Sequence, residues 1–312
     1  MGNKKKIAIL MFMCIIIHIN LYVAYIKIST KKNEHRLQLQ NYKAVTACKI
    51  LFMGDSHTVR SLDLSKIDSS YSLAFYGENN MMNYYKLKHL IENHYCIPKY
   101  IVLPCDIVTH TYGFNLARNN KSFYYDFIPF SEASNLSNNL FTAYLDYFKV
   151  KLFPYIDWQY ALNKVNMDRE KKSKIKFSNL PIDKQRKSAS FFIEDELLKN
   201  RNKSSFYNSR ALNYLQKTID LCNQKKIKLI FVKFPLTKFI FENIKTNVDS
   251  TYLTKRPSEI IINKNNIPIL DFEYIYQNNT ELFFDTHHLN ANGKEKFTEV
   301  FKLKIDSLLK IY

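Results

Sequence analysis

The sequence predicts an α/β protein with a mostly parallel five-stranded sheet that is covered by helices on both faces. Short apolar runs of strand length alternate with longer stretches of helical apolar spacing. Most of these runs stop at a glycine or a proline, as buried strands do where the chain turns. Because parallel strands need long crossover connections, which are usually helical, this alternation predicts a helical layer on each face.

The elements follow from these runs in chain order. The first two strands, KILFM and YSLAFY, end at Gly54 and Gly77. The third and fourth, YIVL and IKLIFVKF, stop before Pro104 and Pro235. The five predicted strands are residues 49–53, 71–76, 100–103, 227–234 and 267–272. The predicted helices are residues 81–94, 207–224 and 293–310.

A long insertion separates the third and fourth predicted strands, at residues 111–200. Its first half is aromatic and helix-like at 140–165, and its second half is polar and basic at 168–190. We interpret it as a lid or partner-binding elaboration of one α/β domain, which is expected to span residues 31–312.

The N-terminal segment, residues 1–30, reads as a membrane anchor. Residues 7–26 carry no formal charge and are interrupted only by His18 and Asn20. At 1.5 Å per residue, such a helix matches a hydrocarbon core of about 30 Å. A secretory signal peptide is the alternative, but no convincing A-x-A cleavage site follows. We expect a single-pass anchor in the cell membrane that contacts lipid through residues 7–26, with the α/β domain outside the cytoplasm, although balanced flanking charges specify the orientation only weakly.

The charge balance is strongly basic, with 46 Lys and Arg against 28 Asp and Glu and a formal net charge of +18. This favours anionic neighbours such as phospholipid headgroups, acidic glycans or nucleic acid, but a solvated basic surface is the more common explanation of such a charge. The basic tract in the insertion is typical of a solvated loop, so we expect no nucleic-acid partner. The five cysteines lack metal-ligand spacing, and we expect no cofactor.

Two motifs carry candidate chemistry. Ser56 follows the first strand directly, at the carboxyl edge where open α/β sheets build their sites. Asp285 and His288 precede the last helix. A serine hydroxyl needs a base that removes its proton, and the base needs an orienting group, so the predicted roles are nucleophile, base and carboxylate. The alternative is that Asp285 or Asn290 merely caps the last helix.

A metal-assisted hydrolase is a second chemical alternative. It would use carboxylates and imidazoles from both motifs, if the two loops converge. The candidate ligands are Asp55, His57, Asp285, His287 and His288. No compact ligand motif such as H-E-x-x-H is present, so we expect no metal.

The blocks ILFMGDSHT and FFDTHHLNANG, together with the turn at Gly77, Glu78 and Asn79, resemble the SGNH (GDSL-like) hydrolase superfamily. The resemblance covers roughly residues 47–110 and 225–310. It implies a flavodoxin-like, three-layer α/β/α sandwich. It also implies that Ser56 is the nucleophile, that Asp285 and His288 complete a triad, and that the Ser56 and Gly77 amides are oxyanion donors.

The chain departs from this family after the third strand. The family usually has a Gly-x-Asn-Asp turn there, whose Asn donates to the oxyanion, whereas this chain has the turn from Leu103 to Asp106. Asn79 or Asn80 is the candidate replacement. The further candidates for substrate binding are His57, Glu78 and Asp106.

The resemblance to the membrane-anchored, cell-envelope branch of this superfamily implies a serine acyl-esterase or O-acyltransferase that acts on a cell-surface polysaccharide or glycan. It also implies a multi-spanning membrane acyltransferase as partner. The alternative is a catalytically inactive scaffold or glycan-binding subunit of an envelope polysaccharide-modification complex, because the turn that ends at Asp106 lacks the family's Asn.

Overall fold

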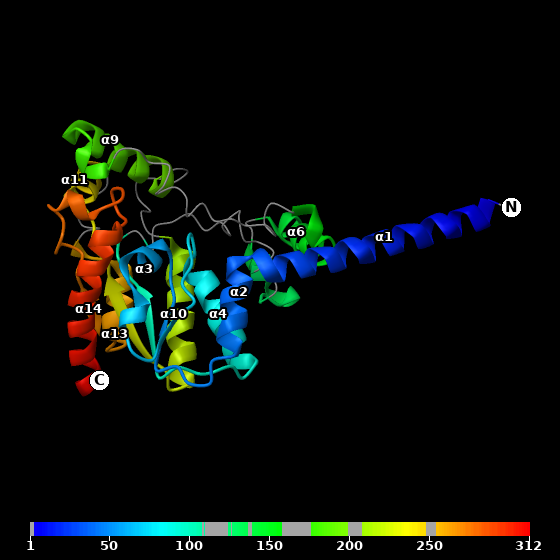
Figure 1. The fold of residues 1–312 in the computed structure, drawn as a ribbon, viewed down its shortest axis with the longest axis horizontal. Coiled ribbons are helices and arrows are strands. Elements are labelled where there is room, and N and C mark those ends of the chain that lie inside the picture. The colour runs from blue at the N-terminus through cyan, green and yellow to red at the C-terminus, as the bar shows by residue number, and fades with distance from the viewer. Residues whose placement is uncertain are drawn as a thin grey trace. The chain divides into compact units, whose positions relative to one another are not determined.

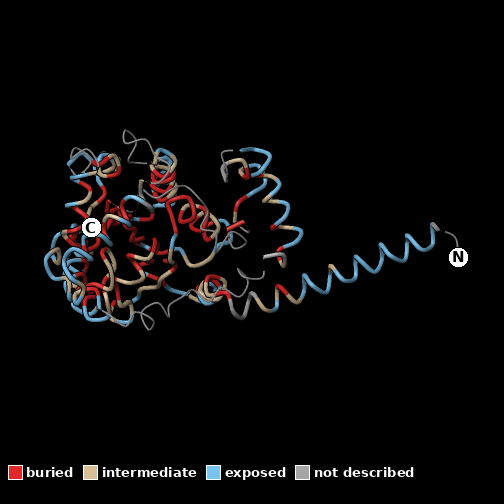
Figure 2. Tube along the Cα trace, turned by 90° about the horizontal axis from the view of Figure 1, so that it is seen from above, coloured by how far each residue is buried: buried red, intermediate tan, exposed pale blue. Residues whose placement is uncertain are grey.

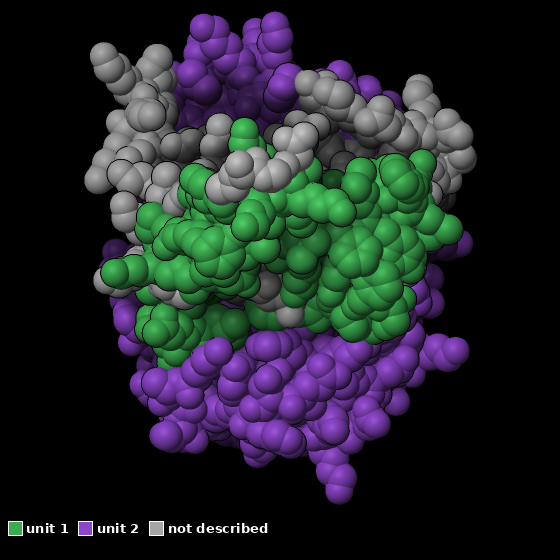
Figure 3. All heavy atoms as spheres, turned by 90° about the vertical axis from the view of Figure 1, so that its right-hand side faces the viewer, with its two compact units in different colours: residues 1–41, 115–167 green, residues 42–114, 168–312 purple. Residues whose placement is uncertain are grey.

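The computed structural model describes residues 3–107, 109, 124–125, 127–136, 139–157, 176–198, 208–247 and 254–312. The chain divides into two compact units, which Figure 3 colours separately. The first unit comprises residues 1–41 and 115–167, and the second comprises residues 42–114 and 168–312. These divisions differ from the expected boundary at residue 30, because the first half of the insertion groups with the N-terminal segment.

The second unit contains a sheet of five strands that are all parallel. The strands are β1 Ile50–Phe52, β2 Ser70–Ser72, β3 Tyr100–Pro104, β4 Lys228–Lys233 and β5 Ile269–Asp271. Their spatial order, β2-β1-β3-β4-β5, is the flavodoxin-like doubly wound order and confirms the predicted fold class. Pro104, which was expected to stop the third strand, is its last residue and pairs with Val232.

Helices of the second unit form a layer on each face of this sheet (Figure 1). The described helices of this unit are α3 Ser56–Ser61, α4 Asn80–Glu92, α9 Ile182–Phe191, α10 Ser209–Gln224, α11 Lys238–Asn247, α13 Pro257–Lys264 and α14 Ala291–Ile311. Of these, α9 and α11 pack against each other beyond the end of the sheet. On one face α10 packs against α4 and α13, and the hydroxyls of Tyr85 and Tyr214 are hydrogen bonded at 3.0 Å. On the other face α14 packs against α3. The bounds of α4, α10 and α14 lie within two residues of the predicted helices.

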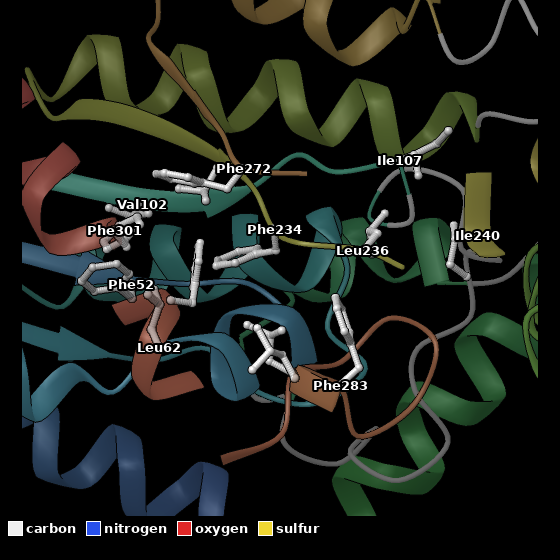
Figure 4. Close-up of a cluster of buried hydrophobic side chains, with 14 of the residues drawn as sticks. Phe52, Leu62, Val102, Ile107, Phe234, Leu236, Ile240, Phe272, Phe283 and Phe301 are labelled. Carbon is white, nitrogen blue, oxygen red and sulfur yellow. The ribbon is translucent and has the colours of Figure 1, made fainter. Parts of the chain in front are cut away.

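A large cluster of buried hydrophobic side chains lies between the sheet and α14 (Figure 4), and a second set is buried on the face covered by α4 and α10. Phe52 of β1 and Val102 of β3 are almost fully buried in the first cluster, and the Phe52 ring lies 5.8 Å from the Phe301 ring of α14. Every residue of β1 and β3 is buried, as expected for a parallel sheet covered on both faces. The loops at the carboxyl ends of β1 and β3 are therefore mounted on a rigid base.

The first unit contains the long helix α1 Asn3–Lys32 and the shorter α6 Leu140–Leu152. A third helix, α2 Glu34–Lys43, follows α1 in the chain. Among the described helices, one segment, Lys4–Ile28, is long and apolar enough to cross a membrane. Figure 2 shows that α1 is exposed along most of its length.

The turn after α6 contacts α1 inside this unit, and α6 itself carries an exposed apolar stripe. The 3-10 turn Pro154–Asp157, which follows α6, packs against α1, and His18 Nδ1 lies 2.7 Å from the Tyr155 hydroxyl. One face of α6 also carries four apolar side chains that are 48–75% exposed. These are Phe141, Leu145, Phe148 and Leu152. Their spacing of three or four residues places them in a single stripe.

Candidate active site

The tight turn after β1 places Ser56 at the carboxyl edge of the sheet. Gly54 has φ +128°, and a Cβ at this position would collide with the Pro104 ring, so the turn requires glycine. Asp55 then caps α3, since its carboxylate accepts a 2.9 Å hydrogen bond from the backbone N–H of His57. Ser56 is the first residue of α3.

A second loop, which follows β2, lies beside this turn. The N–H of Phe75 donates to the Gly54 carbonyl at 3.0 Å, and the N–H of Gly54 donates to Asn83 Oδ1 at 3.1 Å. Gly77 lies in this loop with φ +71°. Adjacent parallel strands therefore bring the serine turn and the Gly77 turn together, as the sheet order requires.

The loop before α14 completes a serine, histidine and aspartate triad. His288 Nε2 lies 2.8 Å from Ser56 Oγ, and His288 Nδ1 lies 2.9 Å from Asp285 Oδ2. Burial by itself would raise the pKa of Asp285, but His288, His287 and their N–H groups hold that pKa well below its usual range. Asp285 is therefore an ionised carboxylate that orients the imidazole toward the serine.

The triad loop is built by local hydrogen bonds. Asp285 Oδ1 accepts from the backbone N–H groups of His287, at 3.0 Å, and of His288, at 2.8 Å. Asn290 caps α14 by accepting from the N–H of Gly293 at 3.0 Å. Asp285 and Asn290 were the two candidates for this cap. Asn290 is the capping residue, so the Asp285 carboxylate is available to His288.

Three N–H donors in the serine turn and in the neighbouring Gly77 loop are free among the described residues. The backbone N–H groups of Ser56 and Gly77 and the side-chain amide of Asn79 donate to no described acceptor. Asn79 Oδ1 caps α4 by accepting from the N–H of Met82 at 3.1 Å, which leaves its NH₂ group available. The Asn80 amide instead donates to the Ala211 carbonyl at 3.0 Å. Of the two asparagines predicted as alternatives, Asn79 is thus the one with a free donor.

Replacing Asn79 by aspartate is expected to lower kcat for an acetyl ester by about 10²–10³-fold, because one oxyanion donor is lost. The new carboxylate still accepts the Met82 N–H, so the melting temperature is expected to change little. Asn208→Asp is the matched control, because Asn208 caps α10 in the same way. Equal turnover in the two variants would remove Asn79 from this role.

His57 and Asp106 form a second, fully buried imidazole–carboxylate pair beside the triad. His57 Nδ1 lies 2.9 Å from Asp106 Oδ2, and the two side chains are 1% and 0% exposed. Burial by itself would lower the pKa of His57, but the Asp106 carboxylate outweighs it and raises that pKa to about 9. Burial would also raise the pKa of Asp106, but His57 and Thr109 lower it to about 2. His57 Nε2 is buried and has no hydrogen-bond partner within the described residues.

Glu78, another residue predicted to bind substrate, is engaged inside the protein. Its carboxylate is paired with the ammonium of Lys86, which also donates to the Leu73 carbonyl. Burial lowers the pKa of Lys86. Glu78 is thus used inside the protein, whereas His57 has a buried ring nitrogen, Nε2, without a hydrogen-bond partner within the described residues.

Sequence patterns did not reveal the surroundings of His287. Its ring stacks on Phe192, with centroids 3.8 Å apart, and burial lowers its pKa well below the usual range. Its ring centroid lies 4.0 Å from that of His288 and 5.5 Å from that of His57. The repeated His in the DTHH block was the only signal for this cluster, and spacing alone could not show that His57 joins it.

No family model matches the chain, and no curated protein matches it. Two solved structures are similar to it. A "putative acylhydrolase" from Bacteroides fragilis NCTC 9343 is 12% identical with a TM-score of 0.42, over 89% of this chain and 97% of that one. A "GDSL-like lipase" from Bacteroides thetaiotaomicron VPI-5482 is 12% identical with a TM-score of 0.44, over 88% and 98%.

Proposed function

We propose that the protein is a membrane-anchored serine acyl-esterase or O-acyltransferase that acts on a cell-surface glycan through an acyl-serine intermediate. The observation that carries this proposal is the 2.8 Å approach of His288 Nε2 to Ser56 Oγ, between residues 232 positions apart in the chain. Asp285 orients the same imidazole from its other nitrogen. This is the arrangement that activates a serine hydroxyl.

The reaction follows from this geometry. Ser56 Oγ attacks the acyl carbonyl carbon while His288 Nε2 takes the hydroxyl proton, and Asp285 stabilises the imidazolium that forms. The free N–H groups of Ser56, Gly77 and Asn79 are the candidate donors to the oxyanion. Collapse of this intermediate expels the alcohol, which receives the proton from His288 and leaves an acyl-serine. Water then completes an esterase cycle, and a sugar hydroxyl completes a transferase cycle.

A hollow of about 400 Å³ in the second unit supports a sugar substrate. Phe283 and Phe284 line it, directly before Asp285, together with Asn290 and Asn292. The Arg60 guanidinium lies 4.6 Å from the Phe284 ring centroid. The half-buried ring of Phe284 and the exposed amide of Asn292 suit the apolar C–H faces and the hydroxyls of a sugar, whereas the Asn290 amide is hydrogen bonded within its own loop.

The first unit supports attachment to a membrane. Lys4–Ile28 has the length and the composition of a span, and the exposed stripe of α6 adds apolar surface in the same unit. Attachment would hold the catalytic unit near envelope glycans, with that unit on the extracytoplasmic side. A multi-spanning membrane acyltransferase is the proposed partner, because an acyl group made inside the cell needs a carrier across the bilayer.

A second candidate function is a catalytically inactive scaffold or glycan-binding subunit. The observation that favours it is the turn after β3, where Asp106 is used internally by His57 and no Asn donates to the oxyanion. Loss of one such donor costs about 3–4 kcal/mol in a comparable site.

Covalent labelling distinguishes these functions. The full chain in detergent micelles is treated with a fluorophosphonate probe, beside Ser56→Ala. We expect one label, mapped by mass spectrometry to Ser56 and absent from the variant, because only an activated serine attacks the phosphorus. A folded protein that neither reacts with the probe nor hydrolyses a chromogenic acetyl ester would contradict the enzyme and favour the scaffold.

A further inference from the structure

We propose that His57, His287 and His288 form a binding site for a divalent transition metal such as Zn²⁺, and that an ion bound there switches off the serine. The switching clause rests on the proposed esterase function, whereas the binding clause does not. One ring nitrogen of each histidine is a candidate ligand, and these three nitrogens all lie within 4.8 Å of one another. Three nitrogens bound to one tetrahedral Zn²⁺ lie about 3.4 Å apart, so modest rotations of the rings would close the site.

In the proposed site Nε2 of each ring is the ligand, and Nδ1 of each ring has a neighbour that orients the ring. The Nδ1 atoms of His57 and His288 contact Asp106 and Asp285, at 2.9 Å each. His287 Nδ1 lies 3.1 Å from the Thr286 hydroxyl. A metal-bound histidine usually donates its second N–H to a carboxylate or another acceptor, which sets its tautomer and raises its basicity.

A buried, unused nitrogen is the observation that points to a ligand. His57 Nε2 has no partner within the described residues, although the side chain is only 1% exposed. A buried polar atom without a partner costs about 1–3 kcal/mol, so a native structure normally gives it a role. Zn²⁺ takes the place of the proton at this atom, and binding therefore releases protons.

The charge of the surroundings favours a cation. Three carboxylates contact this group of histidines through hydrogen bonds: Asp55 through the backbone of His57, Asp106 through its ring, and Asp285 through His288. Imidazole ligands select Zn²⁺, Cu²⁺ and Ni²⁺ over Mg²⁺ and Ca²⁺, which prefer oxygen. A site of this kind would therefore discriminate against the abundant alkaline-earth ions.

Occupation of the site and catalysis exclude each other. The Nε2 atom of His288 accepts the Ser56 proton in the proposed reaction, and the same nitrogen is blocked when it ligates a metal. The Asp285 contact on Nδ1 would remain in both states. Zn²⁺ is therefore an inhibitor in this proposal, because it occupies the lone pair of His288 Nε2 that would otherwise accept the Ser56 proton.

Binding is tested without reference to activity. The full-length Ser56→Ala protein, in detergent micelles, is titrated with ZnCl₂ by calorimetry and with CoCl₂ by visible absorption. We expect one ion per chain and the strong d–d bands of tetrahedral Co²⁺. Adding His57→Asn or His287→Asn is expected to weaken binding by at least tenfold. Loss of a residue that only supports a ligand already weakens metal binding by about tenfold or more, and these variants remove a ligand itself. Adding His89→Asn, in α4, is the matched control and is expected to leave binding unchanged.

Several outcomes overturn the proposal. The first is no binding to folded protein, and the second is equal binding in the His57, His287 and His89 variants, which would place the ion elsewhere. His57→Gln, with its circular dichroism spectrum, repeats the test if His57→Asn fails to fold. Inhibition is scored as the ratio of ester turnover with and without Zn²⁺ in proteins that keep Ser56, namely the native chain and the single variants His57→Asn, His287→Asn and His89→Asn. Turnover that rises with Zn²⁺, or that a chelator abolishes, overturns the inhibitory role and favours metal-assisted hydrolysis. If the protein has no esterase activity, calorimetry still decides the site.

Discussion

Ser56→Ala and His288→Ala are each expected to reduce kcat for ester hydrolysis by several orders of magnitude, on the order of 10⁶-fold in the limit of a fully efficient triad. The reason is that the hydroxyl and the imidazole act as one unit through their 2.8 Å contact. The double variant is therefore expected to be no slower than either single variant. Initial rates with a chromogenic acetyl ester, at saturating substrate, measure all three.

His89→Ala is the control for removal of an imidazole, because His89 lies on α4 and outside the triad. Its turnover is expected to match that of the native protein. Additive losses for Ser56 and His288, with the double variant slower by the product of the two factors, would show that these residues act independently. That result would contradict the triad mechanism, even though the Ser56 and His288 side chains are adjacent.

The second large effect concerns stability. Arg256→Ala is expected to destabilise the second unit by about 3–5 kcal/mol, because it leaves the Glu273 carboxylate buried and unpaired. Arg256 Nη1 and Nη2 donate to the two oxygens of Glu273 at 2.9 and 2.7 Å, and the side chains are 3% and 0% exposed. Thermal unfolding in detergent is expected to show a melting temperature lower by roughly 6–20 °C.

This buried pair also supports the active site. Glu273 Oε1 accepts from the N–H of Ile107, directly after Asp106, at 3.3 Å. Arg186→Ala is the control, because Arg186 pairs with Glu242 at the surface at 3.4 Å and should contribute at most about 1 kcal/mol. The double variant Arg256→Met, Glu273→Leu should recover part of the loss, because no charge stays buried. Equal melting temperatures for Arg256→Ala and Arg186→Ala would show that the carboxylate finds another partner or water.

The fold was predictable because its signals are local. The buried strands β1, β3 and β4 produced continuous apolar runs, and parallel pairing followed from the helices between the strands. The edge strands β2 and β5 were placed less well: they are only partly buried, and they cover 70–72 and 269–271, against predictions of 71–76 and 267–272. The triad was predictable for a related reason. The carboxyl ends of parallel strands share one edge, so Ser56 after β1 and His288 before α14 were expected to meet there.

The rest of the site depended on long-range contacts. His57 and Asp106 are 49 residues apart in the chain. No local sequence pattern indicates that the buried Asp106 carboxylate pairs with the buried His57 imidazole. Asn79 and Asn80 are neighbours with the same side chain, but Asn79 caps α4, whereas Asn80 donates to the carbonyl of Ala211, 131 positions away. The grouping of residues 115–167 with the N-terminal segment was equally hidden, because it depends on contacts such as that between His18 and Tyr155.

The contact between His18 and Tyr155 sets a depth for part of the chain. With α1 in a bilayer, as proposed, His18 lies 14 residues beyond Lys4, or about 21 Å along the helix axis, well inside a hydrocarbon layer of about 30 Å. A hydroxyl bonded to that imidazole has to reach the same level. The turn after α6 would then enter the lipid together with α1. A fragment without α1 would therefore still expose the apolar surface of the turn after α6. The full-length chain in detergent is the better sample for biochemical experiments.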